Sequence, residues 1–175
     1  MKHLIWLPLF LLAFPGWAAS ELYLQLEKNP SPAPLTILKQ VERDYGHQGQ
    51  VIEFELELEA GAITYEVSLA APERGQTLEL KLDRTGGLLE KEWESDELDD
   101  ESERVALRAL RNRPGRFADL VALAIAGQEG FLLEAQLDHN IGISYLEVEL
   151  LTPQGKRKLA LDLDTGERLP ILQWD

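Results

Sequence analysis

Residues 49–83 read GQVIEFELELEAGAITYEVSLAAPERGQTLELKLD, and residues 130–164 read GFLLEAQLDHNIGISYLEVELLTPQGKRKLALDLD at a constant offset of 81 positions. Twelve of the 35 paired positions are identical, and Gly61 against Gly142 fixes the register. After one inserted residue, Arg84, the match resumes at the next turn. We therefore interpret the chain as a tandem duplication, in which the structure of one copy predicts that of the other.

Apolar side chains alternate with glutamates from Ile52 to Glu59, which sends the apolar ones to one face of a strand and the acids to the other. The same period of two recurs further along each copy, and Thr85-Gly86-Gly87 is typical of a turn into a last short strand. Each copy therefore predicts an antiparallel sheet with one solvated face. The expected strands cover residues 52–58, 63–69, 78–82 and 88–93 in the first copy and 132–137, 144–150, 159–163 and 169–174 in the second.

An amphipathic segment precedes each group of strands. Leu38, Val41 and Tyr45 are spaced by three and four residues, and the segment from Phe117 to Ile125 has a similar apolar stripe. A further short helix is expected before each, at 21–28 and 102–111. The sequence thus predicts an α+β fold of two tandem repeats, each with a helix, plus the short preceding helix, packed on one face of a four-stranded antiparallel sheet. We assign repeat 1 to residues 20–95, an acidic connector to 96–103 and repeat 2 to 104–175.

The chain begins with Met1-Lys2-His3 and an apolar run to Phe14, followed by small residues. This order predicts a signal peptide over residues 1–18 that is cut after Ala18, and a periplasmic or secreted protein. An uncleaved anchor is the alternative, although the run is short for a membrane span, which needs about 20 apolar residues.

The charge balance excludes some classes of partner. The full chain has 17 Lys and Arg against 31 Asp and Glu, and loss of residues 1–18 removes Lys2 alone, so the charge becomes 16 − 31 = −15. A field of this sign repels nucleic acid phosphates and anionic lipid headgroups. The chain has no cysteine, so disulfides, thiol lipidation and thiol chemistry are excluded.

Two short patterns occur in the same order in both copies and resemble the PepSY family. The first is Tyr65-Glu66-Val67, matched by Leu146 to Glu149, and the second is the strand end Leu82 to Gly86, matched by Leu161 to Glu167. The resemblance covers most of the mature chain, once per repeat. The first copy departs from the closing pattern, because it has one extra residue and lacks the acid after the glycine.

The resemblance implies a non-enzymatic role, because PepSY modules occur in propeptides of secreted metalloproteases and in other exported proteins, where they are thought to restrain peptidases or regulate partners. We expect a periplasmic protein that binds and modulates a protein partner, such as an envelope protease or a signalling sensor. A small-ligand or cation carrier, with calcium as the cation, is one alternative. A structural spacer in an envelope assembly is another.

The sequence nominates no catalytic, cofactor-binding or metal-ligating residue, and no cofactor is expected. His47 and His139 are the histidines left after cleavage, and both fit exposed turns better than a zinc site. The acids of residues 162–167 are of the type that binds calcium, but they lack the spacing of a calcium loop, so a β-turn is the favoured interpretation.

Trp93 and Trp174 fit either a core cap or an anchor for a partner. The acidic stretch of residues 90–103 fits a solvated connector or a docking strip.

Overall fold

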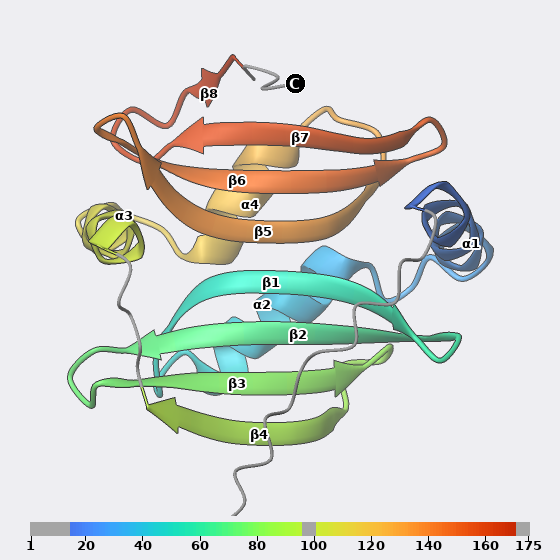
Figure 1. Ribbon diagram of the computed structural model, residues 1–175, viewed down its shortest axis with the longest axis horizontal. Helices are drawn as coiled ribbons and strands as arrows, with labels where there is room; N and C mark the ends of the chain where they lie inside the picture. The colour runs from blue at the N-terminus through green and yellow to red at the C-terminus, as the bar shows by residue number, and fades with distance from the viewer. Residues whose placement is uncertain (1–14, 96–100, 171–175) are drawn as a thin grey trace, which may run out of the picture.

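The computed structural model describes residues 15–95 and 101–170, which form four helices and eight strands (Figure 1). A pair of helices followed by four strands occurs twice in succession. In chain order the elements are α1 (Pro15–Lys28), α2 (Pro34–Tyr45), β1 (Gln50–Glu59), β2 (Ala62–Ala71), β3 (Gln76–Asp83), β4 (Leu88–Ser95), α3 (Glu101–Arg111), α4 (Phe117–Ile125), β5 (Phe131–Asn140), β6 (Ile143–Thr152), β7 (Gly155–Asp162) and β8 (Arg168–Leu169).

All eight strands belong to one antiparallel sheet in the order β4-β3-β2-β1-β5-β6-β7-β8. The α+β class is confirmed, whereas the expectation of two separate four-stranded sheets is wrong. The difference arises at β1 and β5, which pair directly at Glu53 with Gln136, Phe54 with Ala135 and Glu55 with Glu134. In separate sheets both strands would be edges with unpaired backbone groups, and their pairing covers the middle of both edges. We call these three residue pairs the seam.

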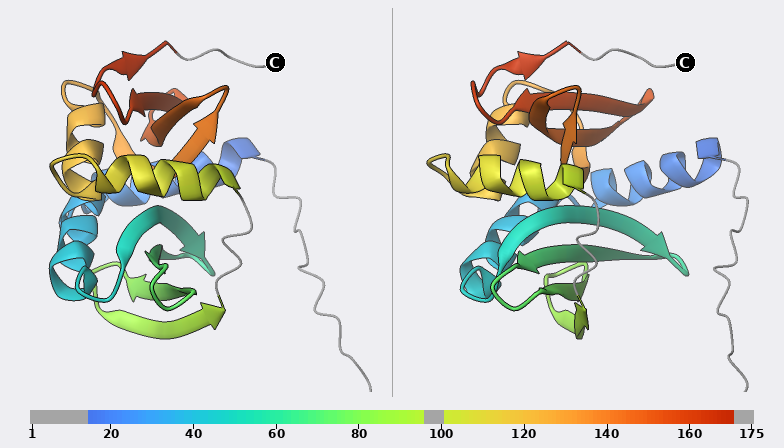
Figure 2. Two further views of the ribbon diagram at one scale, coloured as in Figure 1. Left: turned by 90° about the vertical axis from the view of Figure 1, so that its left-hand side faces the viewer. Right: turned by 60° about the vertical axis from the view of Figure 1, so that its left-hand side comes forward.

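Helices α2 and α4 cover the apolar face of the sheet, which Figure 2 shows on one side of the strands. Ile37, Leu38 and Val41 of α2 are buried, as the three-and-four spacing predicts. The carboxyl group of Glu42 is buried too and accepts hydrogen bonds from the backbone at Phe117 and Ala118, where α4 begins. The two covering helices are therefore tied to each other across the halves of the chain.

Helices α1 and α3 lie at opposite ends of the seam (Figure 1). Helix α3 packs against β5 and β6, whereas α1 packs against β6 and β7 in the other half of the chain. Helix α1 buries Leu22 and Leu26, and the ring of Tyr23 meets that of Phe131 edge-on at 5.5 Å between centroids. Helix α1 begins at Pro15, six residues before the start expected from the sequence.

The hydrophobic core is continuous through both halves of the sheet. At its centre Phe54 and Tyr65 are fully buried, with ring centroids 5.5 Å apart. Phe54 is also the seam partner of Ala135, so the core crosses the seam. Within the described ranges no helix has both the length and the apolar composition that crossing a bilayer requires.

The last strand, β8, begins one residue earlier than expected and is shorter within the described residues. Strand β8 consists of Arg168 and Leu169 alone, and the rest of the strand expected at 169–174 lies beyond the described residues, as does Trp174. Most of the expected acidic connector, residues 96–100, also lies outside them. The first part of the charged stretch, Glu90 to Glu94, belongs to β4.

Candidate functional site: the acidic face of the sheet

The face of the sheet that α2 and α4 leave uncovered is lined with carboxylates. The strand alternation that buries Phe54 and Leu56 directs the intervening glutamates of β1 to this side. Strands β2, β3, β5 and β6 contribute further acids by the same alternation. We call this surface the acidic face and define it by Glu53, Glu55, Glu57, Glu59, Glu66, Glu79, Glu134, Glu147 and Glu149.

Strand register places four of these acids in one row across the seam. Glu66 of β2 is paired with Glu55 of β1, Glu55 with Glu134 of β5, and Glu134 with Glu149 of β6. Like charges at directly opposed positions destabilise a sheet, because their side chains are about 5 Å apart. The centre of the acidic face therefore opposes folding.

Lysines neutralise the two ends of the row. The ammonium group of Lys81 lies 2.8 Å from Glu59 and 3.0 Å from Glu66, and that of Lys156 lies 3.0 Å from Glu149. Within the described part of the chain, no cationic side chain is within 4 Å of Glu55 or Glu134. Two carboxylates thus face each other at the seam without an ion pair.

The environment shifts the titration of these central groups. Partial burial, followed by repulsion from Glu57 and Glu134, raises the pKa of Glu55 to about 7. Desolvation is also the main cause that raises the pKa of Glu134. The charge of Glu149 adds to this rise, and the charges of Lys158 and Lys156 reduce it. Near neutral pH the charge at the seam therefore responds to small changes in pH or to a nearby cation.

A buried hydroxyl on the same face has no hydrogen-bond partner. Thr64 lies between Glu57 and Asp83 in the strand register and is 6% exposed, yet its Oγ1 meets no donor or acceptor in the described residues. The hydroxyl of Tyr65, which points to the core side, also lacks a hydrogen-bond partner in the described residues. Burial raises the pKa of Tyr65 to about 12. These two unpaired hydroxyl groups therefore destabilise the folded state, as the opposed carboxylates do.

The acids of the Asp-Thr-Gly turns serve the backbone. Oδ1 of Asp162 accepts the N–H groups of Asp164 at 2.7 Å and of Thr165 at 2.8 Å. In the first half, Asp83 accepts from the hydroxyl and the N–H of Thr85 and from the N–H of Gly87, and these hydrogen bonds, the hydroxyl's first, lower its pKa. In residues 15–95 and 101–170, no group of three or more acids or histidines has the arrangement of a metal site.

The two histidines have different surroundings. The ring Nδ1 of His139 lies 2.8 Å from the Oγ of Ser144, its direct partner on the neighbouring strand. His47 is exposed in the turn after α2. Ser144 is 4% exposed, which leaves little access for a substrate at this hydroxyl.

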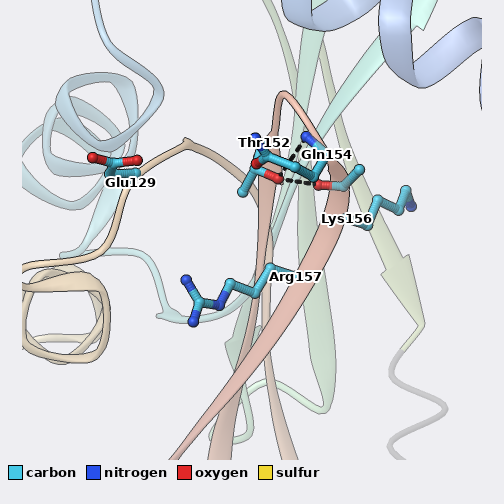
Figure 3. Close-up of a pocket in the computed structure, with 6 residues that line it drawn as sticks. Glu129, Thr152, Gln154, Lys156 and Arg157 are labelled. Carbon is cyan, nitrogen blue, oxygen red and sulfur yellow. Dashed lines mark hydrogen bonds between the residues drawn. The ribbon is translucent and has the colours of Figure 1, made fainter.

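A shallow polar pocket of about 290 Å³ lies at the β6–β7 hairpin, with Glu129 from the α4–β5 connection across from it (Figure 3). Its shape is set by the turn, because Thr152 donates to the carbonyl of Gly155 at 2.7 Å. The ammonium of Lys156 is occupied by Glu149. The pocket has the open, charged lining of a hairpin flank and lacks the apolar walls of a small-molecule site.

Sequence analysis identified the alternating glutamates of β1, but as an ordinary solvated strand face. It missed the row of four acids, because the row exists only through the pairing of β1 with β5. The one available signal was the identity of Glu53 with Glu134 and of Glu66 with Glu147 in the two copies, which reveals repetition and gives no information about contact.

Comparisons with known proteins leave the family open. No known protein-family model matches the chain, and no curated protein matches it. The crystal structure of CD1622 from Clostridium difficile 630, provisionally described as a lipoprotein, has a TM-score of 0.47 and 18% sequence identity to this chain. The match covers 79% of this chain and 91% of the other. A likeness at this level assigns neither a family nor a function.

Proposed function

We propose that this chain is a non-enzymatic protein of the cell envelope that binds a cationic segment of a partner protein on the acidic face and thereby modulates that partner. The observation that supports this proposal is the pair Glu55 and Glu134, which face each other across the seam and, in the described residues, form no ion pair within 4 Å. An arrangement that opposes folding is expected where a sequence serves binding.

A cationic side chain at the seam would relieve this repulsion in two ways. It would contribute direct attraction to the carboxylates, and it would favour their ionised form by lowering the pKa of Glu55. The uniform sign of the face also suits a partner that is guided by charge, since complementary potentials accelerate association and exclude like-charged proteins.

The predicted signal peptide and the PepSY-like order of the motifs suggest the class of partner. An exported peptidase or the sensor domain of a signalling kinase is the partner that this resemblance suggests. The partner would present lysine or arginine side chains on an exposed segment, because the carboxylates of the acidic face lie on the side of the sheet that α2 and α4 leave uncovered.

Photo-crosslinking in intact cells tests the proposal. A photoreactive residue would replace Gln136, which lies between Glu53 and Glu147 in the strand register on the acidic face. The control places the same residue at Lys39, which is exposed on α2 on the other side of the sheet. We expect the Gln136 position to crosslink to a lysine- or arginine-rich segment of an exported protein, identified by peptide mass spectrometry.

The double substitution Glu55→Gln and Glu134→Gln should remove that crosslink, because it replaces both central charges with amides of similar size. Equal crosslinking at the two positions, or a crosslink that survives the double substitution, would count against the acidic face as the binding surface. Loss of the fold is checked by the unfolding temperature, which we expect to rise in the double variant.

A further inference from the structure

The two edges of the sheet differ in length. Strand β8 lies at one edge and pairs with β7 only at Ala160 and Leu161, whereas β4 runs for eight residues at the other edge (Figure 1). Among the described residues, β4 pairs with β3 alone, so its outer backbone groups have no strand partner. An edge of this length is a template for a further strand.

The inner side of β4 is held in place. Trp93 is partly buried, with the guanidinium of Arg74 at 5.1 Å from its ring centroid. Lys91 donates to Oε1 of Gln48 at 2.8 Å and lies 5.5 Å from the ring centroid of Tyr45. The strand is therefore fixed against the fold, and adding a partner would not require it to reorganise.

The side chains of β4 specify what would pair with it. Glu90, Glu92 and Glu94 are exposed and alternate along the strand, and register places Glu90 beside Lys81 and Glu92 beside Glu79. These three acids therefore extend the acidic face to the edge. At the start of the strand, Leu88 and Leu89 are large apolar residues with 46% and 58% of their surface exposed.

We propose that β4 is a β-augmentation site that takes an extended partner segment with lysine or arginine at alternate positions. The basic side chains would meet Glu90, Glu92 and Glu94, the residues between them would face the opposite side, and the backbone would bond to the open edge. This inference rests on the proposed function for the basic character of the partner. Because β2 and β3 lie between β4 and the seam, the segment on β4 is a second contact of that partner, apart from the contact at Glu55 and Glu134.

The charge pattern selects this occupant over a second copy of the chain. Two β4 strands placed edge to edge would bring two sets of three glutamates together, and like charges at opposed positions are destabilising. Edge charges of one sign commonly prevent self-association in this way. The same charges attract a basic strand, so protection against self-pairing and selection of a basic partner are compatible.

Two synthetic peptides with the same composition and charge provide the probe. Acetyl-TKVKVKT-amide places its lysines on one face of a strand, and acetyl-TVKKKVT-amide divides them between the two faces. Their affinities for the full chain are measured by calorimetry, and amide hydrogen exchange is followed along β4 with and without peptide. We expect the alternating peptide to bind about tenfold more tightly, because it satisfies backbone and charge together.

Substitution of Glu90, Glu92 and Glu94 by lysine should weaken binding of the alternating peptide by about tenfold or more. The matched control substitutes lysine for Glu21, Glu27 and Glu167, which are also exposed and change the net charge equally. We expect the control to retain at least a third of the affinity, since exposed charges beyond about 10 Å are screened at ordinary salt.

Hydrogen exchange separates this inference from the function on which it rests. Slower exchange of the β4 amides with the alternating peptide, lost in the β4 variant, supports strand addition. If both peptides bind equally and the β4 amides exchange as before, the edge site is overturned while cationic binding on the acidic face stands. If neither peptide binds at low salt, both the edge site and the proposed function are overturned.

Discussion

At the scale of a single residue, the ionisation of Glu55 opposes folding. Its pKa of about 7 in the folded state exceeds the ordinary value of 4.5, so the folded state binds the proton more tightly than the unfolded chain. The associated stability is fully present below about pH 4.5 and is lost as the pH rises through about 7. Ionised Glu55 therefore lowers stability above neutral pH.

We predict that Glu55→Gln raises the free energy of unfolding at about pH 8 by roughly 1–2 kcal/mol, after allowance for solvent screening of a partly exposed group. At about pH 4 the gain should nearly vanish, because the carboxyl of Glu55 is then protonated in the folded state and mostly protonated in the unfolded state, and a protonated carboxyl and an amide are nearly equivalent. Urea unfolding at both pH values measures this. Glu21→Gln, on an exposed part of α1, is the control, and an equal gain at both pH values would refute the assignment.

Ile141 is a second residue whose conformation opposes folding. It has φ +50° at the tip of the β5–β6 hairpin and is 80% exposed, and Ala60 has the same φ in the equivalent hairpin. Two-residue turns of this type favour asparagine followed by glycine, and a left-handed conformation costs a β-branched residue about 1–2 kcal/mol.

Ile141→Asn should therefore stabilise the protein by roughly 1 kcal/mol, with little loss of buried area. Thermal unfolding checks the gain. Ala60→Asn is the matched variant in the first half, and its gain should be smaller because alanine is not branched at Cβ. Destabilisation by Ile141→Asn would indicate that the isoleucine side chain makes a contact essential to the fold.

At the scale of the element, the β3–β4 turn depends on one carboxylate. Oδ1 of Asp83 accepts from the N–H and the Oγ1 of Thr85 at 2.7 Å each, and from the N–H of Gly87 at 3.0 Å. A Cβ at Gly87 would lie 2.6 Å from Oδ2 of Asp83, which explains why a glycine follows at this point. The turn positions β4, and therefore the edge site.

Asp83→Ala should cost roughly 1–2 kcal/mol, because the N–H groups lose their acceptor. The lowered pKa of Asp83 means that its contribution is present at neutral pH and is lost as the pH falls below the ordinary carboxyl range. Chemical denaturation at neutral pH measures the loss. The control is Asp164→Ala, because Asp164 is an exposed acid in the second turn, and this substitution should change stability by less than about 0.5 kcal/mol. An equal loss of stability in both variants would contradict this role for Asp83.

The sequence predicted individual strands and turns more reliably than it predicted how they are arranged in the sheet. The alternation of Ile52 to Glu59 defined a strand with one polar face, and the glycines at 61 and 142 defined its hairpin turns, because both signals are local. The sequence predicts the start of α1 six residues too late, because Pro15 to Ser20 also has the composition of the end of a signal peptide. Periodicity could not show which strands become edges.

At the scale of the whole molecule, the seam decides the architecture. Its register opposes Glu55 to Glu134, an arrangement that pairwise rules for strands count as unfavourable. The apolar side of the same seam holds Phe54, which is fully buried beside Ala135 and Tyr65. Burial of that core outweighs the repulsion, and sequence reasoning on isolated strands could not compare the two.

We predict that the two halves unfold together, because the core and the paired strands continue through the seam. Phe54→Ala should cost roughly 3–5 kcal/mol and accelerate amide exchange in β6 and β7 as well as in β2 and β3. Hydrogen exchange monitored by mass spectrometry reports each strand. Faster exchange confined to residues 50–95 would mean that the halves are separate folding units.

The central claim is that the acidic face binds cations at the seam, and the titration of Glu55 tests it most directly. The carbon-13 shift of its carboxyl group would be followed against pH in the full chain, alone and with saturating tetralysine. We predict a pKa of about 7 for the free protein and a fall of at least about one pH unit with tetralysine, because a nearby cation favours the carboxylate. A pKa near 4.5 in the free protein, or no change on adding tetralysine, would contradict the account.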